Sequence, residues 1–126
     1  MDPTKTKVLI VEDEVLIAMQ LEMDLAELGY EVCPPAMSGE EAIASVKTEQ
    51  PDIVIMDIHL KGTIDGLAAA GEISRVYRIP IIFLSGYCHN ELMKQTERLS
   101  PVACLTKPVQ SYDLAAAIRS ALSQND

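Results

Sequence analysis

The sequence predicts a doubly wound α/β fold, in which a five-stranded parallel sheet of order 2-1-3-4-5 is covered by five helices. The first observation is a strict alternation of short apolar runs and amphipathic segments along 126 residues. Such alternation is typical of parallel sheets with helices on both faces. The second is the length, because right-handed crossovers in a chain of this size favour one doubly wound sheet. We therefore expect a single domain over residues 1–126, with its core at about 7–122.

The expected strands are five apolar runs that lack the polar alternation of a half-exposed strand. Their length and their β-branched residues favour strands that are buried on both faces. The run at 53–56, Ile-Val-Ile-Met, is the clearest, since Pro51 and Asp52 break the chain just before it. The five runs are 7–11, 30–33, 53–56, 81–84 and 102–105.

The expected helices lie between and after these runs, at about 15–28, 38–49, 66–76, 89–98 and 112–122. Apolar residues spaced by three and four predict a buried stripe on each helix, and the fourth helix is the least apolar. Ser38 with Glu41 matches a capping box, and Ser111 is expected to cap the last helix. The predicted inward residues are Ala18, Leu21, Leu25 and Leu28; Ala42, Ile43 and Val46; Leu67, Ala70, Ile73 and Val76; and Leu114, Ala117, Ile118 and Ala121.

The composition excludes several classes of function. The net charge of -9 argues against direct binding of nucleic acid, which needs a basic patch, and against docking on an anionic membrane. The chain has no tryptophan and one phenylalanine, so an aromatic platform for bases or a flavin is not expected. No apolar run approaches the length of a membrane span, and the start lacks the apolar core of a secretion signal. We therefore expect a cytoplasmic protein.

The three cysteines, Cys33, Cys88 and Cys104, are scattered along the chain and odd in number. This pattern indicates reduced thiols of a cytosolic protein, in preference to a disulfide framework or a zinc site.

Reactive polar side chains stand at or just after four of the expected strands. Glu12 and Asp13 follow the first strand, and Asp57 follows the third. Ser85 and Lys107 follow the fourth and the fifth. In doubly wound sheets, ligands bind beyond the carboxyl ends of the strands, next to the point where the strand order reverses. We therefore expect three carboxylates, a hydroxyl and an ammonium group to meet at one edge.

Such a cluster suits phosphoryl transfer. Three nearby carboxylates repel each other, and Mg²⁺ would relieve the repulsion through oxygen coordination. An aspartate can carry a covalent phosphoryl group, and positioned cations neutralise its charge. Each residue also has an ordinary interpretation, with Asp13 as a helix cap, Ser85 as a turn residue and Lys107 as a solvated lysine. We favour the shared site, because the ordinary interpretations require four coincidences at one edge.

Five short motifs in this order resemble the receiver domain of bacterial two-component response regulators. The resemblance covers about residues 7–122. The motifs are Val-Glu-Asp-Glu at 11–14, Met-Asp-Ile at 56–58, Asp-Gly at 65–66, Leu-Ser-Gly at 84–86 and Thr-Lys-Pro at 106–108.

The resemblance implies that Asp57 accepts a phosphoryl group from the phosphohistidine of a histidine kinase or a phosphotransfer protein. It implies that Asp57 and the main-chain carbonyl of His59 bind Mg²⁺ together with the acidic pair Glu12 and Asp13. It also implies a signalling domain that catalyses only its own phosphorylation and dephosphorylation, and not an enzyme with a separate substrate.

Further implications concern the phosphoryl group and the output. Ser85 and Lys107 would hold the phosphoryl oxygens, and the peptide bond before Pro108 would be cis. An output domain or partner would be contacted through the face of the fourth helix, the fifth strand and the fifth helix.

The chain departs from the family pattern at Cys104, where most receivers have a tyrosine or phenylalanine that acts as a switch. The loop after Asp57 is also one residue longer than in the chemotaxis type. Phe-Leu-Ser-Gly-Tyr at 83–87 resembles a branch of receivers without the switch aromatic. We therefore expect the conformational change to be carried by residues 85–93, with Tyr87 as a reporter, more than by the strand around Cys104.

Three alternatives to a phosphoaccepting receiver domain fit the sequence less well. A flavodoxin-like electron carrier is disfavoured, because the acidic residues 12–14 would repel a phosphate. A phosphatase that acts through an aspartyl phosphate commonly has a second aspartate where this chain has His59. A degenerate receiver that only binds partners is disfavoured, because the whole cluster is present.

Overall fold

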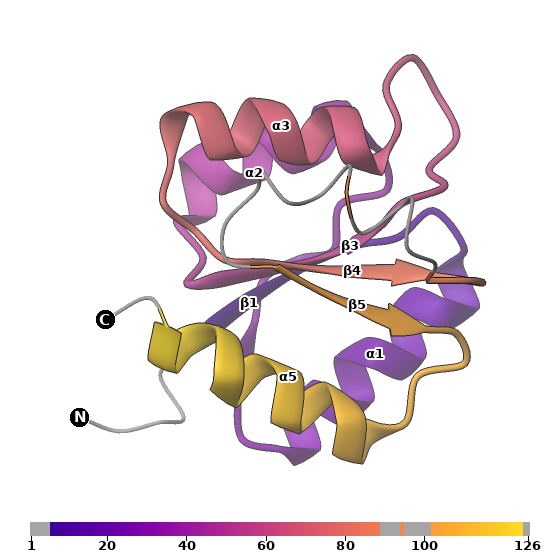
Figure 1. The fold of residues 1–126 in the computed structure, drawn as a ribbon, viewed down its shortest axis with the longest axis vertical. Helices are drawn as coiled ribbons and strands as arrows, with labels where there is room; N and C mark the ends of the chain where they lie inside the picture. The colour runs from indigo at the N-terminus through magenta and orange to yellow at the C-terminus, as the bar shows by residue number, and fades with distance from the viewer. Residues whose placement is uncertain (1–5, 89–93, 95–101, 125–126) are drawn as a thin grey trace.

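The computed structural model describes residues 6–88, 94 and 102–124, and it has the predicted doubly wound architecture (Figure 1). A five-stranded sheet of order β2-β1-β3-β4-β5 forms the middle layer, and every adjacent pair of strands is parallel. The strands are β1 (Lys7–Val11), β2 (Glu31–Val32), β3 (Ile53–Asp57), β4 (Ile81–Ser85) and β5 (Val102–Thr106).

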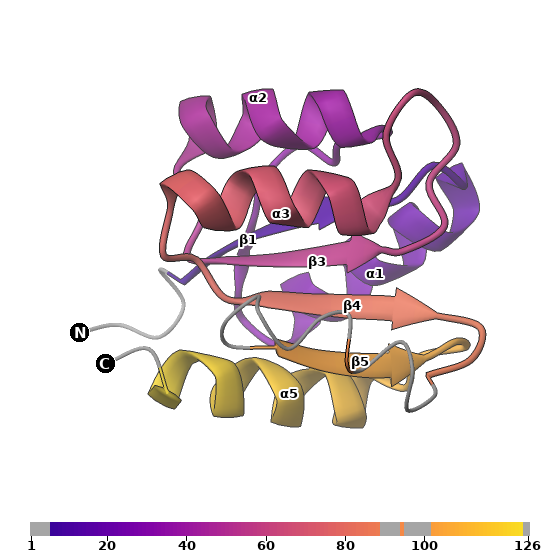
Figure 2. The same ribbon diagram turned by 45° about the horizontal axis from the view of Figure 1, so that its top comes forward.

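Helices cover both faces of this sheet. Figures 1 and 2 show α2 and α3 on one face, and α1 and α5 on the other. Boundaries differ from the predicted ones by one or two residues, as is usual at helix ends. The predicted helix at 89–98 lies outside the described residues, apart from position 94. The four helices found in the described part of the chain are α1 (Val15–Glu27), α2 (Gly39–Glu49), α3 (Gly66–Val76) and α5 (Ser111–Gln124).

The core has two halves, one on each face of the sheet. Within β1, Leu9 and Val11 pack toward the α2–α3 face, whereas Val8 and Ile10 pack toward the α1–α5 face. Because both faces are covered, successive strand residues are all buried, which explains apolar runs without alternation.

Side-chain caps begin two of the helices. Ser38 Oγ accepts a hydrogen bond from the backbone N–H of Glu41 at 3.1 Å, as the capping-box pattern predicts. The carboxylate of Glu41 turns back to accept from the N–H of Met37 at 2.9 Å. Asp65 caps α3 by accepting from Ala68 N–H at 2.9 Å. Ser111 is the first residue of α5, where we expected it just before the helix.

Most of the predicted inward residues are buried or half-buried, but Leu28 and Val76 are exposed. Leu28 is the C-cap of α1, and Val76 is the last residue of α3. The spacing of apolar residues identifies the buried stripe of a helix, but it does not show where the layer beneath the helix stops.

The prediction of reduced, separate cysteines is wrong for two of the three. Cys88 and Cys104 form a disulfide, with 6.1 Å between their Cα atoms, whereas Cys33 is free and buried. Cys104 lies in β5 opposite Phe83 of β4, and Cys88 follows the end of β4. The pairing of two neighbouring parallel strands thus brings together two residues that are 16 positions apart in the sequence.

Candidate functional site

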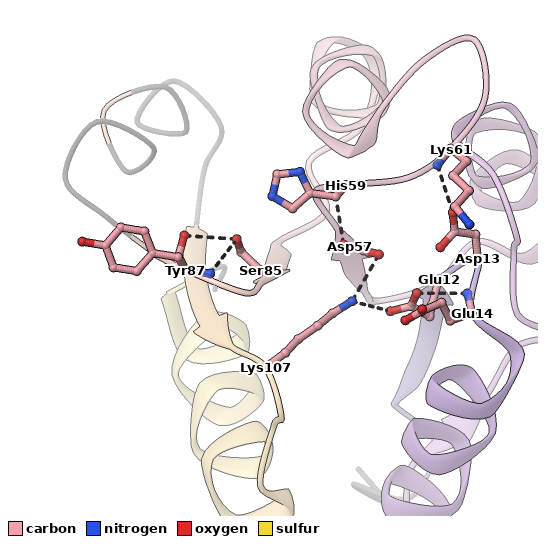
Figure 3. Close-up of polar contacts among 9 residues, drawn as sticks. All are labelled: Glu12, Asp13, Glu14, Asp57, His59, Lys61, Ser85, Tyr87 and Lys107. Atoms are coloured by element: carbon pink, nitrogen blue, oxygen red, sulfur yellow. Dashed lines mark hydrogen bonds and ion pairs between the residues drawn. The ribbon is translucent and has the colours of Figure 1, made fainter.

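The polar residues predicted to meet lie at the carboxyl ends of the strands (Figure 3). Glu12 and Asp13 follow β1, and Asp57 is the last residue of β3. Ser85 ends β4, and Lys107 follows β5. The register between β3 and β4 and between β4 and β5 places Asp57 beside Leu84, and Ser85 beside Thr106. The parallel pairing therefore puts all five residues at one edge of the sheet.

The ammonium group of Lys107 lies between two buried carboxylates. Its Nζ donates to Glu12 Oε1 at 2.9 Å and lies 3.2 Å from Asp57 Oδ2. Glu12 is 0% exposed and Asp57 is 4% exposed, while the side chain of Lys107 is 23% exposed. Lys107 is therefore not a freely solvated lysine, and its positive charge offsets part of the negative charge of the cluster.

Burial and charge act in opposite directions on this group of residues. Burial by itself would lower the pKa of Lys107, but the hydrogen bond to Glu12 and the charges of Asp57 and Glu12 outweigh it, so the pKa is raised. Burial also raises the pKa of Glu12, and the charge of Asp57 adds to this. Hydrogen bonds from Lys107 and from the N–H of Glu14 oppose the rise in the pKa of Glu12 without cancelling it.

Asp13 does not cap the first helix. The N-cap of α1 is Glu14, which makes no side-chain capping bond. Asp13 Oδ2 instead accepts from the backbone N–H of Lys61 at 2.9 Å, across 48 positions of sequence. The N–H of Glu14 donates to Glu12 Oε2 at 3.1 Å. The ordinary interpretation of Asp13 is thus wrong, and its carboxylate is held at the strand edge by the loop after β3.

Glu12, Asp13 and Asp57 could together hold a cation. One carboxylate oxygen from each of the three lies within 4.8 Å of the others. Magnesium prefers such hard oxygen donors and usually keeps several of its waters. The donor set therefore fits Mg²⁺, and a bound ion would neutralise charge at the oxygens of Asp57.

The backbone of His59 contributes to the site, whereas its side chain is exposed. Its N–H donates to Asp57 Oδ1 at 3.0 Å, which orients the carboxylate so that Oδ2 faces Lys107. Coordination of a cation by the His59 carbonyl stays a prediction.

Ser85 is buried at the edge, but its hydroxyl is engaged elsewhere. Its Oγ donates to the carbonyl of Tyr87 at 3.1 Å and accepts from the N–H of Tyr87 at 3.2 Å. Figure 3 shows both bonds directed toward Tyr87, away from Asp57. To contact a group on Asp57, the Ser85 hydroxyl would have to leave this turn.

Gly66 supports the site, although the sequence pattern indicated only a loop or helix start there. A Cβ atom at this position would collide with the Asp57 carbonyl oxygen and would lie 2.8 Å from Ile58 Cα. The N–H of Gly66 donates to the Ile58 carbonyl at 3.0 Å. Only glycine allows α3 to begin this close to the backbone that carries Asp57, and the Asp-Gly pair was the signal for it.

The segment after β5 continues the pairing with β4. The backbone N–H of Lys107 donates to the Ser85 carbonyl at 2.8 Å, and the Lys107–Pro108 peptide bond is cis, as expected.

Residues 8–119 match the model of the response regulator receiver domain, and the chain belongs to that family. It is 38% identical over 118 residues to the transcriptional regulatory protein PdtaR of Mycobacterium tuberculosis, covering 94% of this chain and 57% of PdtaR. It is 34% identical to the phyllosphere-induced regulator PhyR of Methylorubrum extorquens, covering 93% of this chain and 43% of PhyR. The chain thus spans about half the length of these curated relatives.

The solved structures agree with this assignment. The receiver domain of a modulated diguanylate cyclase from Desulfovibrio desulfuricans superposes with a TM-score of 0.87 at 35% identity, covering 96% of both chains. The fold, the family and the acidic cluster together define a response regulator receiver domain of two-component signalling. The chain therefore does not belong to the flavodoxin-like electron carriers.

Proposed function

We propose that Asp57 is the phosphoacceptor of this domain and that a histidine kinase or a phosphotransfer protein supplies the phosphoryl group. One observation carries the proposal. Asp57 is buried and ends β3, yet one of its carboxylate oxygens lies beside the Lys107 ammonium group and the other is held by the His59 N–H. The carboxylate is therefore held in position next to a cation that can neutralise a phosphoryl oxygen.

The reaction transfers a phosphoryl group to an oxygen of Asp57. A new O–P bond forms there, and the bond between phosphorus and the donor nitrogen of phosphohistidine, or the donor oxygen of an acyl phosphate, breaks. Mg²⁺, held by Glu12, Asp13, Asp57 and the His59 carbonyl, would supply charge neutralisation at the phosphoryl oxygens. Lys107 pairs with the phosphoryl group, and Ser85 donates its hydroxyl to a further oxygen.

The phosphorylated domain is itself the signalling state. The domain catalyses its own phosphorylation and the later hydrolysis of its aspartyl phosphate, with no other substrate.

We propose that residues 1–126 form one receiver domain, that it is cytoplasmic, and that it acts on an output domain or partner through β5, α5 and the predicted helix at 89–98. The net charge of -9 argues against direct contact with nucleic acid or an anionic membrane. Within the described residues, no helix is long and apolar enough to cross a membrane.

The phosphodonor protein docks beside α1 in this proposal. A groove of 390 Å³ runs along α1 next to the site, and its lining includes Leu16, Ile17, Lys107 and Pro108. Leu16 is 80% exposed, so an apolar side chain is uncovered in the groove that Lys107 also lines. Leu16→Ser should slow transfer from a phosphorylated histidine protein while leaving labelling by a small acyl phosphate unchanged; equal slowing of both would contradict docking at this groove.

Intact-protein mass measurement tests the phosphoacceptor. With Mg²⁺ and a small acyl phosphate, the wild type should gain one phosphoryl group, and Asp57→Asn should gain none. Asp52→Asn is the matched control, because Asp52 lies just before the opposite end of β3, where it accepts from the N–H of Lys7 at 2.8 Å. It should label like the wild type. Unchanged labelling of Asp57→Asn would refute the assignment, and turnover of a general phosphomonoester would favour the phosphatase alternative.

A further inference from the structure

The disulfide between Cys88 and Cys104 joins the segment that leaves β4 to the middle of β5. Cys88 stands three residues after Ser85 and directly after Tyr87. Cys104 is paired in register with Phe83, inside the sheet. The bond therefore ties residues 86–88 to a strand that is fixed by its hydrogen bonds to β4, so this short segment is anchored at both of its ends.

That segment also holds the Ser85 hydroxyl. Ser85 Oγ makes two hydrogen bonds to the main chain of Tyr87, at 3.1 and 3.2 Å. Turning the hydroxyl toward a phosphoryl group on Asp57 requires both bonds to break. Both partners of the hydroxyl stay available as long as the backbone of Tyr87 stays in place, and the neighbouring residue Cys88 is covalently attached to β5.

We propose that Cys88 and Cys104 form a reversible disulfide that makes binding of a phosphoryl group at Asp57 depend on the redox state. In the oxidised domain the bond holds residues 86–88 against β5 and keeps the Ser85 hydroxyl on Tyr87. In the reduced domain the segment is released, and the hydroxyl is free to turn toward Asp57. The inference rests on the proposed function, because it assumes that Ser85 contacts the phosphoryl group.

The chemistry needs an oxidant, for which a small-molecule disulfide of the glutathione type suffices. One cysteine thiolate attacks the small disulfide, forms a mixed disulfide and releases one small thiol. The second cysteine then attacks the mixed disulfide, closes the Cys88–Cys104 bond and releases the second small thiol. One protein dithiol and one small disulfide thus give one protein disulfide and two small thiols, and the reverse reaction reduces the domain.

The setting of the two residues suits a reversible bond. Cys88 and Cys104 are both half-buried, so part of each residue lies at the surface, whereas Cys33 is 2% exposed. Disulfides are rare in reducing compartments, and those that occur there are usually transient and catalytic or redox-sensing. The position of Cys104 adds a reason for this function, because β5 is paired with the strand that ends in Ser85.

Beryllofluoride binding in the presence of Mg²⁺ tests the inference, since this ion mimics the phosphoryl group. The domain is equilibrated with reduced or oxidised glutathione, and the dissociation constant is measured by calorimetry. The dissociation constant for beryllofluoride should be at least about fivefold higher in oxidised wild type than in reduced wild type. A fivefold change is the lower end of the usual coupling between two sites. Because coupling is reciprocal, beryllofluoride should shift the glutathione ratio that half-oxidises the pair by the same factor.

Serine variants provide the controls. Cys88→Ser and Cys104→Ser should each bind beryllofluoride like the reduced wild type under both conditions. Cys33→Ser should keep the full redox response, because Cys33 takes no part in the disulfide. Thiol alkylation followed by mass measurement reports the oxidised fraction in every sample.

The outcomes separate this inference from the proposed function. Equal dissociation constants in the two redox states, with normal labelling of Asp57, would overturn the inference alone. Absence of a disulfide at every glutathione ratio would do the same. A reduced domain that is never labelled on Asp57 would overturn the proposed function and the inference with it.

Discussion

Replacing Lys107 by methionine tests the electrostatic account of the site. The substitution keeps a long unbranched side chain and removes the positive charge that lies 2.9 Å from Glu12 and 3.2 Å from Asp57. Both carboxylates are nearly inaccessible to solvent, so neither can recover full hydration in the variant. The folded state of Lys107→Met is therefore expected to hold uncompensated negative charge.

The expected cost follows from the burial of the three groups. Removing one partner of a fully buried ion pair typically costs about 3–5 kcal/mol. Water reaches the Lys107 side chain, which is 23% exposed, so we expect a smaller loss in the free energy of unfolding, about 2–3 kcal/mol. The exposed pair of Arg75 with Glu72, at 2.7 Å, provides the control. Arg75→Met should cost about 0–1 kcal/mol.

Urea unfolding at about pH 7 with a metal chelator measures both losses. The deficit of Lys107→Met should also shrink toward about pH 5, because without the Lys107 hydrogen bond the already raised pKa of Glu12 rises further. A group whose pKa is higher in the folded state binds more protons there, so stability increases as the pH falls. A loss no larger than that of Arg75→Met, or a deficit that grows at low pH, would refute the electrostatic account.

Three further predictions concern the metal, the backbone and the free thiol. A hundredfold excess of Mg²⁺ over its dissociation constant should stabilise the wild type by about 2.7 kcal/mol, and equal rises in melting temperature for Asp13→Ala would exclude Asp13 as a ligand. Gly66→Ala should lower the free energy of unfolding in urea by about 3 kcal/mol, because its Cβ meets the Asp57 backbone. Gly71→Ala should raise it by about 0.5–1 kcal/mol, because a Cβ at that position has nothing within 4 Å. Equal effects of the two substitutions would contradict the packing argument. Cys33 should resist alkylation in the folded, reduced domain, because burial shields it and raises its pKa, and mass measurement should find two modified thiols, not three.

Residues 85–93 are expected to carry the conformational change, and the first residues of this segment are held by specific bonds. Residues 89–93 lie outside the described part of the chain. Within it, Tyr87 holds the Ser85 hydroxyl, and Cys88 is bonded to the very position that lacks the usual aromatic residue. Cys104 is therefore more than a small residue that cannot act as a switch, because it connects β5 to the exit of β4.

The fold, and the set of residues that gather at the site, were predictable from the sequence. Uninterrupted apolar runs such as 53–56 indicate strands buried on both faces, and alternation with amphipathic segments requires parallel strands. Parallel strands have their carboxyl ends at one edge, so any polar residue that ends a strand must lie there. This rule alone brought Glu12, Asp13, Asp57, Ser85 and Lys107 together, without knowledge of a single contact.

The contacts themselves depended on the tertiary structure. The sequence placed Lys107 at the edge but did not show that its ammonium group lies between Glu12 and Asp57, since that depends on how far its side chain reaches across the edge. The sequence left a helix-cap role open for Asp13, and the structure excludes it, because the Asp13 carboxylate accepts from the N–H of Lys61 in the loop after β3. The disulfide was missed because a cysteine count contains no distances. Strand pairing brings the Cα atoms of Cys88 and Cys104 to 6.1 Å, and a bond between them depends on that separation in space and not on their spacing in the chain.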